Sequence, residues 1–135
     1  MVSKNKTILV TASAKRLGRS IVTDLVKRGW KVAIHYNQSK ILAEETADYL
    51  FKIGGKVSIH QADLTCNLDI KKLIREIESE NSVWTGLINN AGYFNYDNGT
   101  NFKFEELQNH LSVNFIAPAL LTQALAKNTL KMKKK

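Results

Sequence analysis

The sequence predicts an α/β fold in which a doubly wound parallel sheet of four strands is covered by four helices. Short apolar runs of the kind found in buried strands alternate along the chain with helical patterns. Strands separated by helices of about a dozen residues pair in parallel through right-handed crossovers. A length of 135 residues fits one domain with one core.

Two strand–helix units are predicted in the first part of the chain. The apolar runs KTILV at 6–10 and KVAIHY at 31–36 have the length of strands. Each precedes a helical pattern, at 17–28 and at 40–53, and Ser39 is placed to cap the second helix. The side chains expected to face the core from these helices are Leu17, Ile21, Val22, Leu25, Val26, Leu42, Ala43, Thr46, Ala47, Leu50 and Phe51.

Two more units follow in the same order. Strands are predicted at 56–61 and 86–90, and helices at 68–80 and 104–127. The third helix has an apolar stripe that is expected to face the core, made of Leu68, Leu73, Ile74 and Ile77.

The net charge of +8 is concentrated at the end of the chain. Five lysines between residues 127 and 135 supply most of it, and the rest of the chain carries only +3. We therefore expect the domain to cover residues 1–127 and residues 128–135 to form a disordered, solvated basic tail, with no nucleic acid as partner. A nucleic-acid-binding arm is the alternative, and it predicts a steep dependence of binding on salt.

The composition favours a cytoplasmic protein without a membrane segment. No apolar run approaches the roughly 20 residues that a membrane-spanning helix needs. The N-terminal residues lack the apolar region of a signal peptide. Cys66 is the only cysteine, which excludes an intrachain disulfide.

Four segments fall at the carboxyl ends of predicted strands, where open parallel sheets bind ligands. They are 11–18, 35–39, 62–64 and 89–94. The first of them opens a helix, contains small residues and carries two cationic side chains, which suits a phosphate group. Taken alone, it is equally consistent with an ordinary strand–helix turn.

The segment TASAKRLG at 11–18 resembles a motif of the short-chain dehydrogenase/reductase family, written Thr-Gly-x-x-x-Gly-x-Gly. Thr11 and Gly18 match, while Ala12 and Arg16 replace two glycines. The run AKRLG is similar to that of the pteridine reductase branch. The resemblance implies a Rossmann-like fold with strand order 3-2-1-4, truncated after the fourth strand. If the turn requires a positive φ at Ala12, the alanine is strained there.

The end of the second predicted strand favours NADP(H) over NAD. Enzymes that use NAD place a carboxylate here against the ribose 2′-hydroxyl, and the segment HYNQS at 35–39 has none. His35, Asn37 and Ser39 are candidate donors to a 2′-phosphate, with Arg16 expected nearby. A solvated strand end with a helix cap at Ser39 is the alternative.

The run LINNAG at 87–92 matches the family's Asn-Asn-Ala-Gly motif. The resemblance implies that this motif lines the ribose and nicotinamide, that Asp63 and Leu64 hold adenine, and that Phe94 stacks on a pterin substrate. A polar turn, a turn residue or helix cap at Asp63, and an exposed or core Phe94 are the respective alternatives. The residues assigned to the cofactor are Thr11, Ser13, Arg16, Leu17, Gly18, His35, Tyr36, Asn37, Ser39, Asp63, Leu64, Asn89, Asn90, Ala91 and Gly92.

Asn114 is the candidate catalytic residue. Pro118 has no N–H group, so the Asn114 carbonyl loses its helical partner and the fourth helix is expected to kink. The resemblance implies that this asparagine holds a water molecule in a proton relay, and a surface kink without function is the alternative. In the family a serine and a Tyr-x-x-x-Lys motif follow the fourth helix. Tyr36 and Lys40 have this spacing but precede that helix, so they do not fit the motif, and the catalytic serine, tyrosine and lysine are expected to be absent from this chain.

The resemblance implies the cofactor-binding part of an NADPH-dependent reductase acting on a pterin, a folate or another small carbonyl or imine compound. Little or no turnover is expected from this chain alone. The alternatives are a non-catalytic NADPH-binding module and an inactive remnant whose end, NTLKMKKK, arose by frameshift in an adenine-rich gene. An open fourth strand predicts marginal stability or self-association, and family members often form homo-oligomers.

Overall fold

The sheet has the predicted architecture. In the computed structural model, which describes residues 5–134, four parallel strands lie in the order β3-β2-β1-β4. β1 spans Lys6–Val10, β2 Lys31–Tyr36, β3 Val57–Gln61 and β4 Val83–Ile88. The carboxyl ends of all four strands therefore meet along one edge of the sheet.

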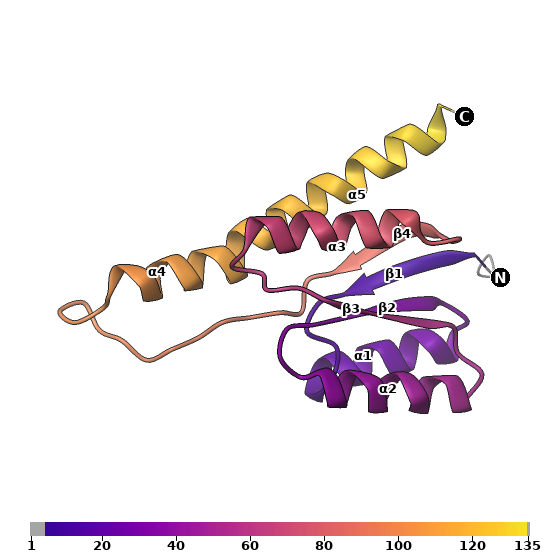
Figure 1. Ribbon diagram of the computed structural model, residues 1–135, viewed down its shortest axis with the longest axis horizontal. Helices are drawn as coiled ribbons and strands as arrows, with labels where there is room; N and C mark the ends of the chain where they lie inside the picture. Colours follow the sequence, from indigo (N-terminus) through magenta and orange to yellow (C-terminus); the bar gives the residue numbers. More distant parts are fainter. Residues whose placement is uncertain (1–4, 135) are drawn as a thin grey trace.

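Helices cover both faces of the sheet (Figure 1). α1 (Arg16–Lys27) and α2 (Lys40–Lys52) pack on one face, and α3 (Asn67–Ser79) and α5 (Ala117–Lys133) pack on the other. Within the described part of the chain, no helix combines the length and the apolar character needed to cross a bilayer.

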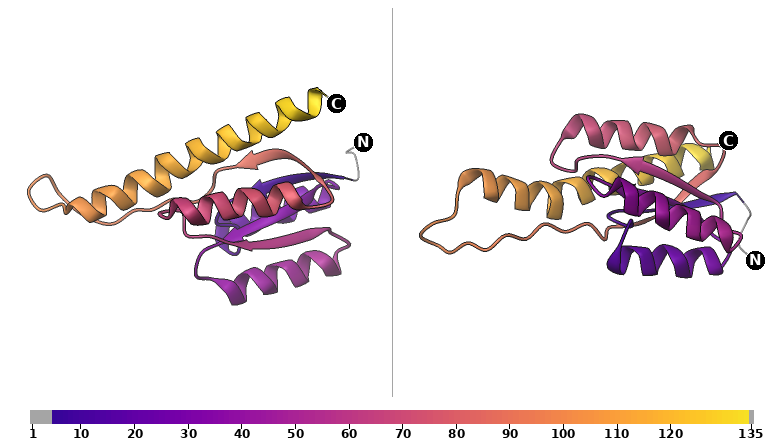
Figure 2. Two further views of the ribbon diagram at one scale, coloured as in Figure 1. Left: turned by 45° about the horizontal axis from the view of Figure 1, so that its top comes forward. Right: turned by 60° about the horizontal axis from the view of Figure 1, so that its bottom comes forward.

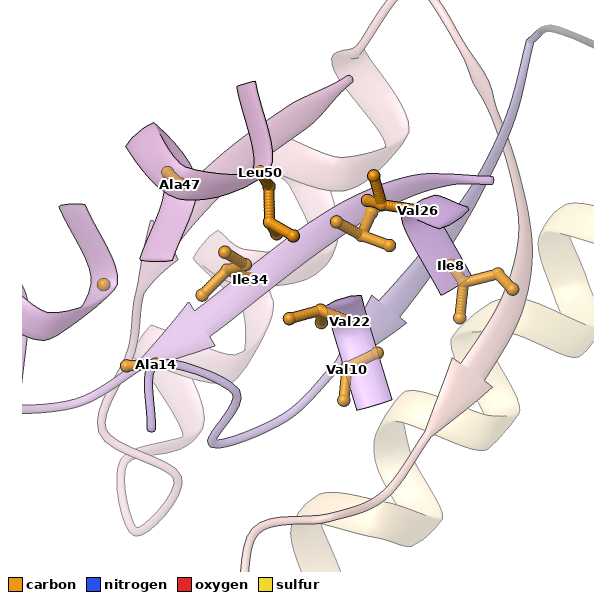
Figure 3. Close-up of a cluster of buried hydrophobic side chains, with 10 residues drawn as sticks. Ile8, Val10, Ala14, Val22, Val26, Ile34, Ala47 and Leu50 are labelled. Atoms are coloured by element: carbon orange, nitrogen blue, oxygen red, sulfur yellow. The ribbon is translucent and has the colours of Figure 1, made fainter. Parts of the chain in front are cut away.

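Alternate residues of the central strands build two separate cores. Ile8 and Val10 of β1 pack with α1 and α2 (Figure 3), whereas the intervening Leu9 packs with α3 and α5. Because both faces are covered, the central strands are apolar on both sides, which is why they read as continuous apolar runs in the sequence.

Some details of the sequence prediction were wrong. The fourth strand begins at Val83 and ends at Ile88, and does not occupy 86–90, because its first residues pair with the start of β1. In α3 the second residue, Leu68, lies at the solvent-facing start of the helix, and Ile70 is buried in its place. Three further side chains expected in the core lie at the margins of their helical faces and are exposed, namely Leu17, Leu42 and Phe51.

The fourth helical run is longer and less regular than predicted. It consists of α4 (Phe104–Leu111), a π-helical segment η1 (Ser112–Ile116) and α5, which appear as one continuous helix (Figure 2). In η1 the amide of Ala117 bonds the carbonyl of Ser112, a π-type i→i−5 bond. Pro118 follows at once and offers no amide, so the helix absorbs the proline by a local widening.

The expectation of a disordered tail was also wrong for residues 128–133. They continue α5 as far as Lys133. Leucine, methionine and lysine are good helix formers, and no helix breaker interrupts the run NTLKMK. Residue 135 lies outside the described residues.

A polar cluster ties the end of α3 to the sheet. His60 of β3 bonds Glu76 and Glu80 through its two ring nitrogens, each at 2.9 Å, and Glu80 also pairs with Lys31 of β2. Burial lowers the pKa of His60, but the hydrogen bonds to Glu80 and Glu76 outweigh it and raise the pKa above 6.5. Burial likewise opposes ionisation of Glu80, yet hydrogen bonds from His60 and Lys31 lower its pKa to about 2.

The start of α1 packs against the turn that precedes it because residue 18 is glycine. A Cβ at Gly18 would lie 2.3 Å from the carbonyl oxygen of Ala12 and 2.6 Å from the Cα of Ser13. No side chain tolerates such distances to backbone atoms, so glycine is what allows the helix to begin so close to the strand end.

The polar cluster predicts how stability depends on pH. A lowered carboxyl pKa stabilises the fold above about 4.5 and loses this contribution as the pH falls toward about 2. A raised histidine pKa stabilises the fold below 6.5 and loses its contribution as the pH rises through the folded-state value. The cluster should therefore contribute most between about pH 4.5 and 6.5.

Urea unfolding across this pH range tests the cluster. Glu80→Gln should lower the free energy of unfolding at pH 6 by about 2 kcal/mol, because it leaves His60 and Lys31 short of a charged partner. It should also flatten the acid limb of the profile, while His60→Gln should flatten the limb above pH 6.5. Variant profiles that run parallel to that of the unaltered chain would contradict this account.

Gly18→Ala should destabilise the fold by about 3 kcal/mol, because the backbone of the turn must move to admit the methyl group. Gly99→Ala is the matched control, since a Cβ at that exposed position meets no atom within 4 Å. The control should change the free energy of unfolding by less than about 0.5 kcal/mol. Equal losses in the two variants, measured in urea, would show that the close approach at Gly18 carries no such cost.

Candidate nucleotide-binding site

Two adjoining clefts lie at the carboxyl edge of the sheet and share Ala12, Asn37 and Gln38. The smaller, of about 250 Å³, is lined by Ala12, Ala14, Lys15, Tyr36, Asn37, Gln38 and Ser39. The larger, of about 420 Å³, is lined by Ala12, His35, Asn37, Gln38, Asp63, Leu64, Thr65, Ala91, Gly92, Tyr93, Asn109 and Val113. All four strand ends thus contribute to one groove, as the sequence predicted.

The turn at 11–18 adopts backbone conformations that favour glycine at two other residues. Ala12 has a φ of 50° and Arg16 a φ of 52°. The expected strain at Ala12 is therefore confirmed, and Arg16 shares it. Each left-handed residue costs on the order of 1–2 kcal/mol, so surrounding contacts must hold the turn in place.

Thr11 and Asn90 are among those contacts. The buried Thr11 hydroxyl accepts the amides of Asn90 and Ala91 at 3.0 and 2.9 Å, and the Asn90 side chain donates to the carbonyl of Ala12 at 3.1 Å. These side chains bond the protein backbone, so the geometry makes them supports of the groove.

Ser13 and His35 are also buried supports. The Ser13 hydroxyl donates to the carbonyl of Val10 at 2.7 Å. One ring nitrogen of His35 accepts the amide of Ala12 at 3.0 Å and the other faces the carbonyl of Ala62 at 2.9 Å. Both nitrogens are thus occupied, and the expectation that His35 donates to a cofactor phosphate was wrong. Its ring is only 2% exposed, too buried to reach such a group.

The cation beside the strand end of β2 is Lys15. Lys15 lines the smaller cleft together with Asn37 and Ser39. Arg16, the cation expected there from the sequence, lines a different cleft of about 380 Å³ on the outer side of α1 and α2, beside Arg19 and Tyr49. The two cations are adjacent in the sequence, yet they line different clefts, and the backbone at Arg16 has a positive φ.

The end of β3 forms the opposite wall of the groove. Leu64 is buried, and the Asp63 carboxylate accepts the amide and the hydroxyl of Thr65 at 2.9 and 2.7 Å. The alternative interpretation of Asp63 as a turn residue therefore holds, and the residue lines the larger cleft as well. Ser39 is the residue before α2, but it makes no side-chain capping bond.

The end of β4 leads from the groove into a projecting arm, which consists of the loop at 93–103 and α4 (Figure 1). The Asn114 side chain brackets the backbone of Tyr93, accepting its amide at 2.7 Å and donating to its carbonyl at 2.8 Å. The Tyr93 phenol bonds Glu106, which raises its pKa and keeps it protonated. Phe94 is 74% exposed and lies outside the lining of both clefts.

The site residues predicted from the sequence fall into two groups. Those that line the groove are His35, Tyr36, Asn37, Ser39, Asp63, Leu64, Ala91 and Gly92. Those that lie outside its lining are Thr11, Ser13, Arg16, Leu17, Gly18, Asn89 and Asn90. Gln38 and Thr65 line the groove but were not among the predicted residues, and Lys15 was expected only as one of the two positive charges of the turn at 11–18. No cluster of histidine, cysteine and acidic residues suited to a metal ion occurs among residues 5–134.

Comparison with known proteins agrees with this geometry. Residues 6–135 match the family described as short chain dehydrogenase. The "Short-chain dehydrogenase/reductase homolog YusS" of Bacillus subtilis is 37% identical over 87 residues, which cover 64% of this chain and 80% of that protein. The "3-oxoacyl-[acyl-carrier-protein] reductase FabG" of Staphylococcus epidermidis is 34% identical over 88 residues, covering 65% and 36% of the two chains.

Solved structures extend the likeness to three dimensions. "FolM Alternative dihydrofolate reductase 1" from Brucella suis, solved in complex with NADP, superposes with a TM-score of 0.87 at 30% identity, covering 94% of this chain and 51% of that one. A short-chain dehydrogenase/reductase from Serratia marcescens superposes with a TM-score of 0.86 at 28% identity, covering 91% and 50%. The chain therefore spans about half the length of these two structures.

The family match covers every described strand and helix, and the strand order and the groove at the strand ends agree with it. The chain belongs to the short-chain dehydrogenase family.

Proposed function

We propose that this chain is the NADPH-binding part of a short-chain oxidoreductase. The observation that carries the proposal is the groove across all four strand ends, in which Lys15 stands beside the uncharged Asn37, Gln38 and Ser39. A cation among neutral donors suits a phosphate, whereas a carboxylate at this place would suit a free ribose 2′-hydroxyl. The NADP complex of the Brucella suis structure supports the same cofactor.

The groove also offers suitable surroundings for the pyrophosphate, the adenine, and the ribose and nicotinamide of the cofactor. The first amides of α1 lack helical partners and are aimed toward the strand ends, where a pyrophosphate would bind. The apolar Leu64 and the polar Asp63 would hold adenine. A Cβ at Gly92 would lie 4.0 Å from its nearest neighbour, the side-chain oxygen of Asn114, so the backbone leaves room for ribose and nicotinamide beside Ala91.

The oxidoreductase of which this chain is the proposed part would reduce a small carbonyl or imine compound, and a pterin or folate is the preferred candidate substrate. NADPH would supply the hydride. Of the family's catalytic group, these 135 residues contain only Asn114, whose side chain fixes Tyr93 and so leaves its main-chain carbonyl as the candidate water ligand. Phe94 is exposed and follows Tyr93, which lines the larger cleft, so it remains the candidate to stack on a pterin.

The chain alone is expected to bind NADPH without turning over. Incubation of the purified chain with NADPH and a pterin, followed at the absorbance of reduced nicotinamide, should show no oxidation above the protein-free rate. Steady oxidation would overturn the assignment of this chain as a binding part. Absence of both binding and oxidation would favour an inactive remnant.

Lys15 sets the expected preference for NADPH. Lys15→Ala should weaken NADPH binding about tenfold, because an exposed charge-assisted contact to the 2′-phosphate is lost. NADH lacks that phosphate, so its affinity should change little. The measurement is a titration of each nucleotide followed by nicotinamide fluorescence.

Arg16→Ala is the matched control, since Arg16 is the adjacent cation but faces the outer cleft. It should change NADPH affinity by less than about threefold, roughly 0.6 kcal/mol. If the unaltered chain binds NADH and NADPH equally, or if Arg16→Ala weakens NADPH binding more than Lys15→Ala, the assignment of the phosphate site fails.

The edge position of β4 supports the proposal that the chain assembles with further copies of itself. Among residues 5–134, β4 is paired with β1 alone, so one side of its backbone is open to another strand. Sedimentation velocity should show oligomers that grow with protein concentration, from about 10 to 200 µM for a weak contact. A sharp monomer boundary throughout this range would contradict self-association.

A further inference from the structure

We infer that His35 is a positioning residue that sorts the amide groups of the turn at 11–18, holding two of them inward and leaving the following ones for a phosphate. This inference rests on the proposed function. The sequence suggested that His35 contacts the phosphate directly. Instead, His35 contacts the turn, and the turn would contact the phosphate.

Two consecutive amides of the turn are received by this one residue. The amide of Ala12 donates to the His35 ring nitrogen Nδ1 at 3.0 Å, and the amide of Ser13 donates to the His35 carbonyl oxygen at 3.0 Å. A backbone N–H group can only donate, so Nδ1 must be the unprotonated nitrogen. The ring proton then sits on Nε2 and is donated to the carbonyl of Ala62 at 2.9 Å.

The ring is held in its neutral form. Burial lowers the pKa of His35 and outweighs the opposing effect of its hydrogen bond to Ala62, and the nearby His60 lowers the pKa further. A protonated ring would present a second N–H group to the amide of Ala12 and break that bond. Burial therefore keeps the imidazole in the one state that can accept from the turn.

The hydrogen bond to the His35 ring is made by Ala12, a residue whose backbone conformation is strained. Ala12 has a φ of 50°, a conformation that costs alanine on the order of 1–2 kcal/mol. If the ring bond were lost, Ala12 would be free to relax to a negative φ, which turns the peptide plane between Thr11 and Ala12. The plane between Ala12 and Ser13 would stay in place, because Asn90 donates to the carbonyl of Ala12 at 3.1 Å and the amide of Ser13 donates to the main chain of residue 35.

The same ring reaches the opposite wall of the groove. Its partner Ala62 immediately precedes Asp63, the residue proposed to hold adenine, and the amide of Ala62 bonds the carbonyl of Tyr36 at 3.0 Å. One imidazole therefore bridges the phosphate-binding turn and the adenine wall. We expect its two bonds to contribute separately to cofactor affinity.

Two conservative variants separate the two bonds. The amide oxygen of asparagine reaches the place of Nδ1, so His35→Asn can still accept from Ala12. The amide nitrogen of glutamine reaches the place of Nε2, so His35→Gln can still donate to Ala62 but leaves Ala12 without an acceptor. His35→Gln should weaken NADPH binding about tenfold, or roughly 1.4 kcal/mol, and His35→Asn by less than about threefold.

Amide hydrogen exchange in the cofactor-free chain provides a readout independent of binding. In His35→Gln the amide of Ala12 should exchange at least about tenfold faster, whereas that of Ser13 should be unchanged because it bonds the main chain of residue 35. Equal acceleration at both amides would indicate general loosening and would overturn the sorting role. If the unaltered chain does not bind NADPH, the proposed function fails while this test still decides the role of His35.

Rescue by glycine completes the test. Glycine adopts a positive φ without strain, so Ala12→Gly in the His35→Gln background should restore NADPH affinity to within about threefold of the unaltered chain. Failure of this rescue would overturn the role of His35 in holding Ala12. Should the variants not fold, the ring nitrogen resonances of the unaltered chain decide, since protonation at Nδ1 would contradict the inference.

Discussion

A single buried hydroxyl joins the carboxyl ends of β1 and β4, the central and edge strands on the nicotinamide side of the proposed groove. Thr11, directly after β1, accepts the amides of two residues that follow β4, and Asn90 returns a bond to the carbonyl of Ala12. These contacts bring the phosphate-binding turn and the proposed nicotinamide end within reach of one ligand. The close start of α1 at Gly18 and the strained φ angles of the turn are possible because the strand ends are fixed to each other in this way.

The fold could be predicted because its signals are periodic and local. β1 and β2 are apolar on both faces, and the helices between them carry apolar stripes, so their order and parallel pairing follow from pattern alone. The residues at which helices begin and end were harder to predict from the sequence. Residues 128–133 have the charge of a tail but the helix propensity of their neighbours, and the π-helical segment before Pro118 depends on hydrogen-bond geometry that a pattern of residue types does not encode.

The site could be predicted in place but not in the direction of its side chains. Lys15 and Arg16 are chemically alike in a motif, yet Lys15 lines the groove, whereas Arg16, which has a positive φ, lines the cleft on the outer side of α1. His35 has the chemistry of a phosphate donor, yet the alternation of β2 places it on the same face of the sheet as the buried Ala33, and backbone groups occupy both of its ring nitrogens. In both cases the direction of the side chain depends on the local backbone conformation or on the face of the strand that the residue occupies. The residue type alone determines neither.

The pairing of β1 with β4 has a consequence for how the molecule is assembled. Thr11 and the carbonyl of Ile88 that it contacts are 77 positions apart in the sequence, whereas β1, β2 and β3 pair over much shorter separations. Closing the longer loop costs more chain entropy and yields its contacts last. The half of the groove built by β4 is therefore the half that folding completes at greatest entropic cost, and a ligand spanning both halves would stabilise that final closure.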